Sequence, residues 1–245
     1  MIKISDTEYF SNDRTIRFLN MDCNEFMAGC KENEFDLIHN DPPYGINADK
    51  KQSKLKGKRG HHKTSGSYKI YHDTDWDSEI PTNNHFEEMF RVSKNQIIWG
   101  GNYFDSLNIS GVVVWDKGES IYDNDGEMAK VSFGGFRIFR MSRADAYINK
   151  CDMKIHPTQK PIELYNFILD KFTKPTDTIL DCFGGSMSNA IACHMKRRKL
   201  TIIELDVDYF KSALSRFETY EMQVEDIKEF GYAKTKLNSV NPTLF

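Results

Sequence analysis

The sequence predicts an α/β fold, a largely parallel, doubly wound sheet in a single domain spanning residues 1–245. Apolar runs of strand length alternate with segments of helical spacing. With 245 residues, 39% of them hydrophobic, the chain can bury a substantial core. Irregular stretches interrupt the alternation at residues 45–77 and 117–155, and we expect these to be inserts that carry specificity.

Strands are expected where short runs rich in β-branched or aromatic residues occur. In chain order they are Ile16–Leu19, Phe35–His39, Gln96–Trp99, Val112–Trp115, Phe136–Phe139, Thr178–Leu180 and Leu200–Ile203. Helical spacing of apolar residues predicts helices over Cys23–Cys30, Asn84–Val92, Pro161–Phe172, Ser188–Lys196 and Tyr209–Tyr220. Pro161 suits a first helical turn, because that position needs no backbone N–H.

Composition and cysteine usage exclude several classes of protein. The five cysteines form no CxxC pair and follow no signal peptide, so we expect reduced thiols in a cytoplasmic protein. No apolar run approaches the roughly 20 residues needed to cross a bilayer, so no membrane role is expected. The histidines and acidic residues lack metal-ligand spacing, and no metal site is expected.

The net charge of -3 conceals a basic segment between Asn47 and Lys69, which has eight Lys or Arg residues against one acid, Asp49. Such a segment cannot bury itself, and a solvated loop is one interpretation. The other is a loop that meets the phosphates of a nucleic acid. The candidate substrate-binding residues here are Lys54, Lys56, Lys58, Arg59 and Lys63.

The stretch Asp41-Pro42-Pro43-Tyr44 follows a buried apolar run and is the strongest local signal of a site. Proline fixes φ and removes a backbone donor, so the pair makes a rigid turn. The turn holds a carboxylate, a peptide carbonyl and an aromatic face around a small space, which suits a planar ring carrying an amine. Its position after a strand, with further signals downstream, favours a site over an ordinary loop.

A second signal is the strand Thr178–Leu180, which runs into a small-residue turn containing Gly184 and Gly185. Small residues let a ligand approach the backbone. The strand Leu200–Ile203 then ends in Glu204, about 20 residues onward, where a doubly wound nucleotide site has an acid for ribose hydroxyls. The turn lacks G-x-G-x-x-G and no Walker lysine follows, so NAD and ATP are poorly supported. S-adenosylmethionine carries no phosphate and needs neither device.

An Asp-Pro-Pro-Tyr box comes early in the sequence, and a Phe-x-Gly box, Phe183-Gly184-Gly185, comes late. In this order of motifs the chain resembles the β-class amino-methylating DNA methyltransferases, whose catalytic half precedes the cofactor half. The resemblance implies a seven-stranded, Rossmann-like methyltransferase sheet with short recognition inserts. It also implies transfer of a methyl group from S-adenosylmethionine to the N6 amine of an adenine flipped out of double-stranded DNA. Family members that methylate cytosine N4 more often begin the box with serine, so Asp41 favours adenine.

The resemblance assigns roles to individual residues. Asp41 and the Pro42 carbonyl would accept the amine hydrogens and Tyr44 would stack on the base, with Pro43 completing the catalytic box. Lys160, within a His-Pro-Thr-Gln-Lys-Pro element, would pair with the carboxylate of S-adenosylmethionine. The implied cofactor-binding residues are Asp22, Cys23, Lys160, Asp181, Phe183, Gly184, Gly185, Ser186 and Glu204, and the residues bordering the target-base pocket are Trp99, Asn102 and Tyr103.

Three alternatives stay open. The first is methylation of cytosine N4, which would use the same mechanism on another base. The second is RNA as the substrate in place of DNA. The third is an inactive nucleic-acid-binding protein of the same fold, because the family usually has glycine where Met187 stands. We expect the Met187 side chain to point into the core beneath the turn. The resemblance allows a homodimer, and the tail Asn241–Phe245 resembles segments that bind the replication sliding clamp, which gives a hypothesis for a further partner.

Overall fold

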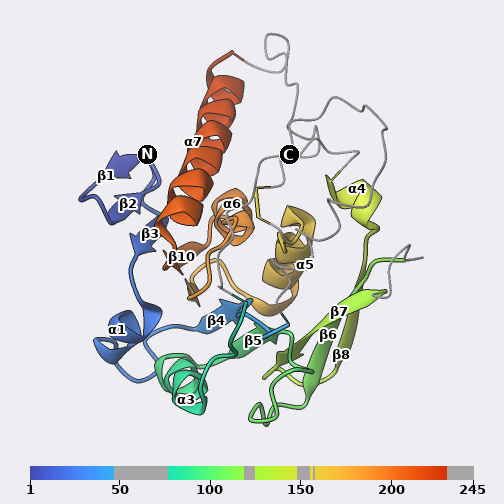
Figure 1. Ribbon diagram of the computed structural model, residues 1–245. Helices are drawn as coiled ribbons and strands as arrows, with labels where there is room; N and C mark the ends of the chain where they lie inside the picture. The colour runs from blue at the N-terminus through green and yellow to red at the C-terminus, as the bar shows by residue number, and fades with distance from the viewer. Residues whose placement is uncertain (47–76, 119–124, 148–154, 157, 231–245) are drawn as a thin grey trace, which may run out of the picture.

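The computed structural model describes residues 1–46, 77–118, 125–147, 155–156 and 158–230. The strands among these residues form one ten-stranded sheet in the spatial order β1-β2-β3-β10-β9-β4-β5-β7-β6-β8 (Figure 1). The strands are β1 Ile2–Lys3, β2 Glu8–Phe10, β3 Ile16–Asn20, β4 Leu37–Asn40, β5 Gln96–Trp99, β6 Gly111–Asp116, β7 Gly126–Val131, β8 Phe136–Arg140, β9 Thr178–Asp181 and β10 Lys199–Glu204. The helices are α1 Cys23–Ala28, α3 Asn83–Val92, α4 Arg143–Tyr147, α5 Ile162–Phe172, α6 Ser188–Met195 and α7 Val207–Phe230.

All seven expected strands are present, as β3, β4, β5, β6, β8, β9 and β10, and they run in one direction. The largely parallel sheet is therefore confirmed. The expected number of strands is wrong, because β1, β2 and β7 extend the sheet to ten. β2 and β7 run antiparallel to their neighbours. β1 and β2 are only two and three residues long, and β7 carries charged residues between its apolar ones, so neither pattern stands out in the sequence.

Helices cover both faces of the sheet, as the expected doubly wound architecture requires. Successive strand residues point to opposite faces, so Ile97 and Trp99 join the core beneath α5, α6 and α7, while Ile98 joins the core beneath α1 and α3 (Figure 1). Both faces of β5 are thus buried, which explains its continuous apolar run.

Three boundaries differ from the sequence-based expectation. Pro161 is the N-cap of α5, with extended backbone, and the helix begins at Ile162. Helix α7 continues past Tyr220 to Phe230, and the burial of Ile227 shows that its apolar face continues too. Residues 117–155 are not one irregular insert, since they contain β7, β8 and α4. Over the described part of the chain, no helix combines the length and apolarity that crossing a membrane would need.

Candidate active site

The carboxyl ends of the parallel strands open into a cavity of about 1050 Å³. Ligands of doubly wound sheets bind at these ends, where the direction of winding reverses. Strands β4 and β9 are neighbours at this point although they lie far apart in the sequence. Asn40, the last residue of β4, joins the two strand ends, because its Oδ1 accepts a hydrogen bond from the Cys182 N–H at 2.9 Å. The Asp-Pro-Pro-Tyr box and the glycine turn therefore meet at one cavity.

Asp41, Pro42, Pro43 and Tyr44 all line this cavity. The Tyr44 hydroxyl donates a hydrogen bond to Asp41 Oδ1 at 2.6 Å. Asp77 also lines the cavity and holds the turn, since its Oδ1 accepts the N–H groups of Tyr44 at 2.7 Å and Gly45 at 3.0 Å. Asp77 ends the stretch that the sequence marks as an insert, and no local pattern distinguishes it from other acids there.

An aromatic pair forms one wall of the cavity. The rings of Tyr44 and Tyr103 stack with centroids 5.0 Å apart and an interplanar angle of 13°. Asn102 lies beside Tyr103 on the wall, as expected. Trp99 does not line the cavity, so this expectation is wrong: its side chain is fully buried and its Nε1 donates to His39 Nε2 at 3.0 Å. The alternation of side chains along β5 turns Trp99 toward the face covered by α5, α6 and α7.

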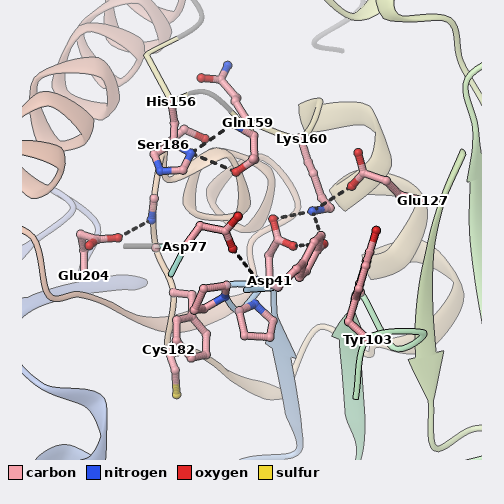
Figure 2. A pocket seen from close by; sticks show the side chains of 18 of the residues that line it. Asp41, Asp77, Tyr103, Glu127, His156, Gln159, Lys160, Cys182, Ser186 and Glu204 are labelled. Atoms are coloured by element: carbon pink, nitrogen blue, oxygen red, sulfur yellow. Dashed lines mark hydrogen bonds and ion pairs between the residues drawn. The ribbon is translucent and has the colours of Figure 1, made fainter. Parts of the chain in front are cut away.

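The glycine turn forms the opposite wall, through Phe183, Gly184, Gly185 and Ser186. Glu204 closes it: its Oε2 accepts the Gly185 N–H at 2.7 Å, and its Oε1 accepts the N–H of Asp206 at 2.9 Å. Burial raises the pKa of the Glu204 carboxyl to about 7. Figure 2 shows Glu204 and Ser186 on the side of the cavity away from Tyr103.

Met187 adopts the left-handed conformation at the start of α6, with φ 56°, and its side chain is fully buried in the core. It is absent from the described residues that line the cavity. The expectation that Met187 points beneath the turn is confirmed, and the methionine does not narrow the approach to Gly184 and Gly185.

The start of α1 supplies a third part of the wall. Asp22 is the N-cap of α1 and accepts a backbone N–H two residues onward at 2.7 Å. Cys23 Sγ lies 3.6 Å from His85 Nε2, and the His85 ring stacks on Phe183 with centroids 5.5 Å apart. A hydrogen bond with Cys182 lowers the pKa of the Cys23 thiol to about 6, although burial opposes this, and His85 lowers it further. His85 had no local sequence signal, because it reaches the site from the first turn of α3.

Asp181 lies behind the cavity wall and is not one of its lining residues. Its Oδ2 accepts a hydrogen bond from Asn189 Nδ2 at 2.9 Å, and its Oδ1 accepts the Phe183 N–H at 3.0 Å. Burial raises the pKa of the Asp181 carboxyl to about 7. The structure thus gives Asp181 a supporting position beneath the turn instead of the expected contact with a cofactor.

Lys160 lines the cavity, but its ammonium group is ion-paired with Asp41 and also lies 3.2 Å from Glu127 Oε2 (Figure 2). Glu127 comes from β7, which the sequence did not reveal as a strand. Among the described residues, no group of three or more His, Cys, Asp or Glu side chains has a geometry that could hold a metal ion. The basic candidates Lys54, Lys56, Lys58, Arg59 and Lys63 lie outside the described residues.

Known proteins match parts of this chain in sequence. A family model described as DNA methylase matches residues 114–215, which include β9, the glycine turn and Glu204. Type II methyltransferase M.PvuII from Proteus hauseri is 28% identical over 86 residues, or 34% of this chain and 26% of the relative. DNA adenine methyltransferase YhdJ from Escherichia coli (strain K12) is 31% identical over 97 residues, or 36% of this chain and 33% of the relative. The matches thus span between about a quarter and a third of these curated relatives.

Solved structures share the fold over most of the chain. PvuII DNA methyltransferase (cytosine-N4-specific) aligns with a TM-score of 0.55 and 14% identity, covering 89% of this chain and 93% of that one. The M1.HpyAVI–SAM complex aligns with a TM-score of 0.51 and 19% identity, covering 81% and 97%. Residues 114–215 thus resemble the DNA methylase family model, and the chain shares its fold with the solved PvuII DNA methyltransferase.

Proposed function

We propose that this protein is an S-adenosylmethionine-dependent DNA methyltransferase whose target is the N6 amine of an adenine flipped out of the duplex. The observation that carries the proposal is the shared cavity, because Asp41-Pro42-Pro43-Tyr44 lines one part and the turn with Glu204 lines another. The cavity volume of about 1050 Å³ is at the upper end of the range for small-molecule sites, roughly 300 to 1,000 Å³, which suits a nucleoside cofactor together with a base.

The residues around the turn fit S-adenosylmethionine. Glu204 and Asp22 offer carboxylate acceptors for ribose hydroxyls and for an adenine amine, and the stacked rings of His85 and Phe183 offer an aromatic surface. Gly184 and Gly185 line the cavity, so the backbone of the turn borders the space proposed for the cofactor. When bound, S-adenosylmethionine supplies an electrophilic methyl group on its sulfonium.

The residues of the catalytic box fit an exocyclic amine. Such an amine is a weak nucleophile, because its lone pair is delocalised into the ring. Acceptance of its two hydrogens by the Asp41 carboxylate and the Pro42 carbonyl favours a pyramidal nitrogen with a localised lone pair. Tyr103 and Tyr44 present aromatic rings on which a base can stack, and stacking helps offset the few kcal/mol lost when a base leaves the duplex.

Duplex DNA is the proposed substrate because the relative YhdJ is named a DNA adenine methyltransferase and the aligned PvuII structure is named a DNA methyltransferase. The basic residues between Asn47 and Lys69 remain predicted phosphate contacts. A homodimer, a sliding-clamp partner for residues 241–245 and a cytoplasmic location also stay predictions.

Cytosine N4 is a second candidate target, favoured by the similarity to M.PvuII, whose solved structure is named cytosine-N4-specific. Its amine presents the same two hydrogens, so Asp41 and Pro42 would act alike on either base. The inactive binding protein loses the observation on which it rested, because the Met187 side chain is buried in the core.

The experiment is incubation of the purified protein with tritiated S-adenosylmethionine and unmethylated duplex DNA, followed by digestion to nucleosides. Label in N6-methyladenine that disappears in Asp41→Ala supports the proposal. Label in N4-methylcytosine would keep the mechanism and change the base. Demonstrated cofactor binding without label in either nucleoside would contradict a DNA methyltransferase acting alone.

A further inference from the structure

Two lysines and two acids form a continuous chain of contacts across the cavity wall. Lys117 Nζ lies 2.5 Å from Glu127 Oε1, and Lys160 Nζ lies 3.2 Å from Glu127 Oε2. Lys160 is also ion-paired with Asp41, and its Nζ donates a hydrogen bond to the Tyr44 hydroxyl at 3.2 Å. Figure 2 shows Lys160 between Asp41 and Glu127. The catalytic carboxylate is therefore connected to β6 and β7 through Lys160.

Burial explains why both acids are needed. The side chains of Lys160 and Lys117 are only 1% and 2% exposed, so each ammonium group has left water. A buried charge is costly unless an opposite charge and hydrogen bonds replace its hydration. The two carboxylates balance the two ammonium groups, which leaves the cluster with no net charge.

The cluster also controls the ionisation of Asp41. Burial raises the pKa of Asp41 and the carboxylate of Glu127 raises it further, whereas the ammonium group of Lys160 lowers it. The two lysines overcome the effect of burial on Glu127 and lower its pKa to about 2, so Glu127 stays ionised. The titratable groups around Asp41 are Tyr44 on its own loop, Asp77, Lys117 after β6, Glu127 on β7, Lys160 before α5, Tyr165 on α5 and Asp181 on β9.

An amine that binds Asp41 has to compete with Lys160 for the lone pairs of one carboxylate. A carboxylate offers about four acceptor positions, and Tyr44 and Lys160 already use two of those on Asp41. Lys160 can yield part of its contact with Asp41 without becoming an unpaired buried charge, because Glu127 Oε2 lies beside it.

We propose that Lys160 and Glu127 are positioning residues for the transfer: Lys160 acts on the Asp41 carboxylate and not on the carboxylate of the cofactor, and Glu127 takes up the Lys160 ammonium when the target amine binds Asp41. The inference rests on the proposed methyltransferase function. It assigns Glu127, which lies outside the Asp-Pro-Pro-Tyr box and the glycine turn, a part in the reaction.

The test compares Lys160→Met and Glu127→Gln with wild type in cofactor affinity and in the pH profile of kcat for DNA methylation. Lys160→Met should lower kcat about 10- to 100-fold, as expected for loss of a hydrogen bond to a charged group, and should move the acid limb of the profile to higher pH. Glu127→Gln should move the same limb to lower pH and raise KM for DNA about tenfold, since Lys160 is then held by Asp41 alone. Both variants should bind S-adenosylmethionine within about twofold of wild type.

Lys196→Met is the matched control, because this lysine pairs with Asp170 on the exposed surface and removing it should move neither limb nor affinity. Opposite shifts in the two variants cannot arise from a general loss of structure. If Lys160→Met loses more than tenfold in cofactor affinity and its acid limb does not move, the inference is overturned. Lys160 would then be the partner of the cofactor carboxylate. Unmoved limbs in both variants would overturn it as well, with the methyltransferase proposal intact. Absence of transfer by wild type would instead refute the proposed function, and this inference with it.

Discussion

Cofactor affinity should depend on the protonation of Glu204. This carboxyl lies at the end of β10 on the cavity wall, and burial raises its pKa from 4.5 to about 7 even though two backbone N–H groups donate to it. An ionised carboxylate can accept ribose hydroxyls with both oxygens, whereas protonation turns one oxygen into a donor and weakens this acceptance. Binding of S-adenosylmethionine should therefore favour the ionised form, and affinity should fall as pH falls.

The magnitude follows from the pKa. With a value of about 7, the ionised fraction of Glu204 is about 0.9 at pH 8 and about 0.03 at pH 5.5. If only the ionised form accepts the ribose hydroxyls, the dissociation constant rises about 30-fold between these two pH values, which corresponds to about 2 kcal/mol. Binding at pH 6 should also release close to one proton per site.

Isothermal titration calorimetry of wild type and Glu204→Gln from pH 5.5 to 8, in two buffers of different ionisation enthalpy, measures both quantities. Glu204→Gln should bind more weakly at pH 8 and lose the pH dependence specific to Glu204. Any dependence common to both proteins belongs to another group or to the ligand. Asp181→Asn is the control, since it removes the other carboxyl with a pKa of about 7 without altering a lining residue. Parallel curves for wild type and Glu204→Gln would refute the reasoning.

Three further predictions concern residues next to the cavity. Gly100→Ala should lower kcat about 100-fold with little change in cofactor affinity, which transfer and binding assays measure. The reason is that a Cβ at this position would lie 2.2 Å from Tyr44 Cε1 and that the backbone has φ +69°. Met187→Ala should lower the free energy of unfolding by about 2 to 5 kcal/mol in urea titrations and leave cofactor affinity unchanged, since the side chain is fully buried and outside the cavity wall. Cys23, with a pKa of about 6, should be alkylated by iodoacetamide at pH 7, and S-adenosylmethionine should protect it; equal labelling with and without the cofactor, read by peptide mass spectrometry, would contradict this.

The central strands of the parallel sheet, β4, β5 and β9, were predictable because they are buried on both faces, and strands of that kind read as short apolar runs. Each of the seven expected runs is a strand, including β8, whose residues are mostly exposed. β7 was not predictable in this way. It carries Glu127 and Lys130 among its apolar residues, and it pairs with β5 and β6. Pairing with neighbouring strands leaves no periodic pattern within the sequence of β7 itself.

The candidate site was predictable where a residue directly follows a strand of the parallel sheet. Asp41 follows β4 and Glu204 ends β10, and carboxyl ends of parallel strands share one edge, so both had to lie near each other. The direction in which a side chain at a strand end points does not follow from this rule. Trp99 and Asp181 are the last residues of β5 and β9, and both point away from the cavity, Trp99 into the core and Asp181 toward α6. Short motifs place residues at the edge of the sheet, but packing decides which of them face the ligand.

The role of Lys160 shows how far a resemblance between motifs can extend. The motif places an ammonium group near the cavity, and the structure confirms that position. The ion-pair partners of Lys160, however, are acidic residues that come from other elements of the fold. Glu127 arrives from β7 and Asp41 from the loop after β4, and both lie within ion-pair distance of Lys160 Nζ. A lysine already neutralised by two carboxylates has less attraction left for the carboxylate of a ligand than an unpaired lysine would have. The partner of Lys160 is therefore a property of the assembled site, and measuring cofactor affinity in Lys160→Met separates it from the role that the motif implies.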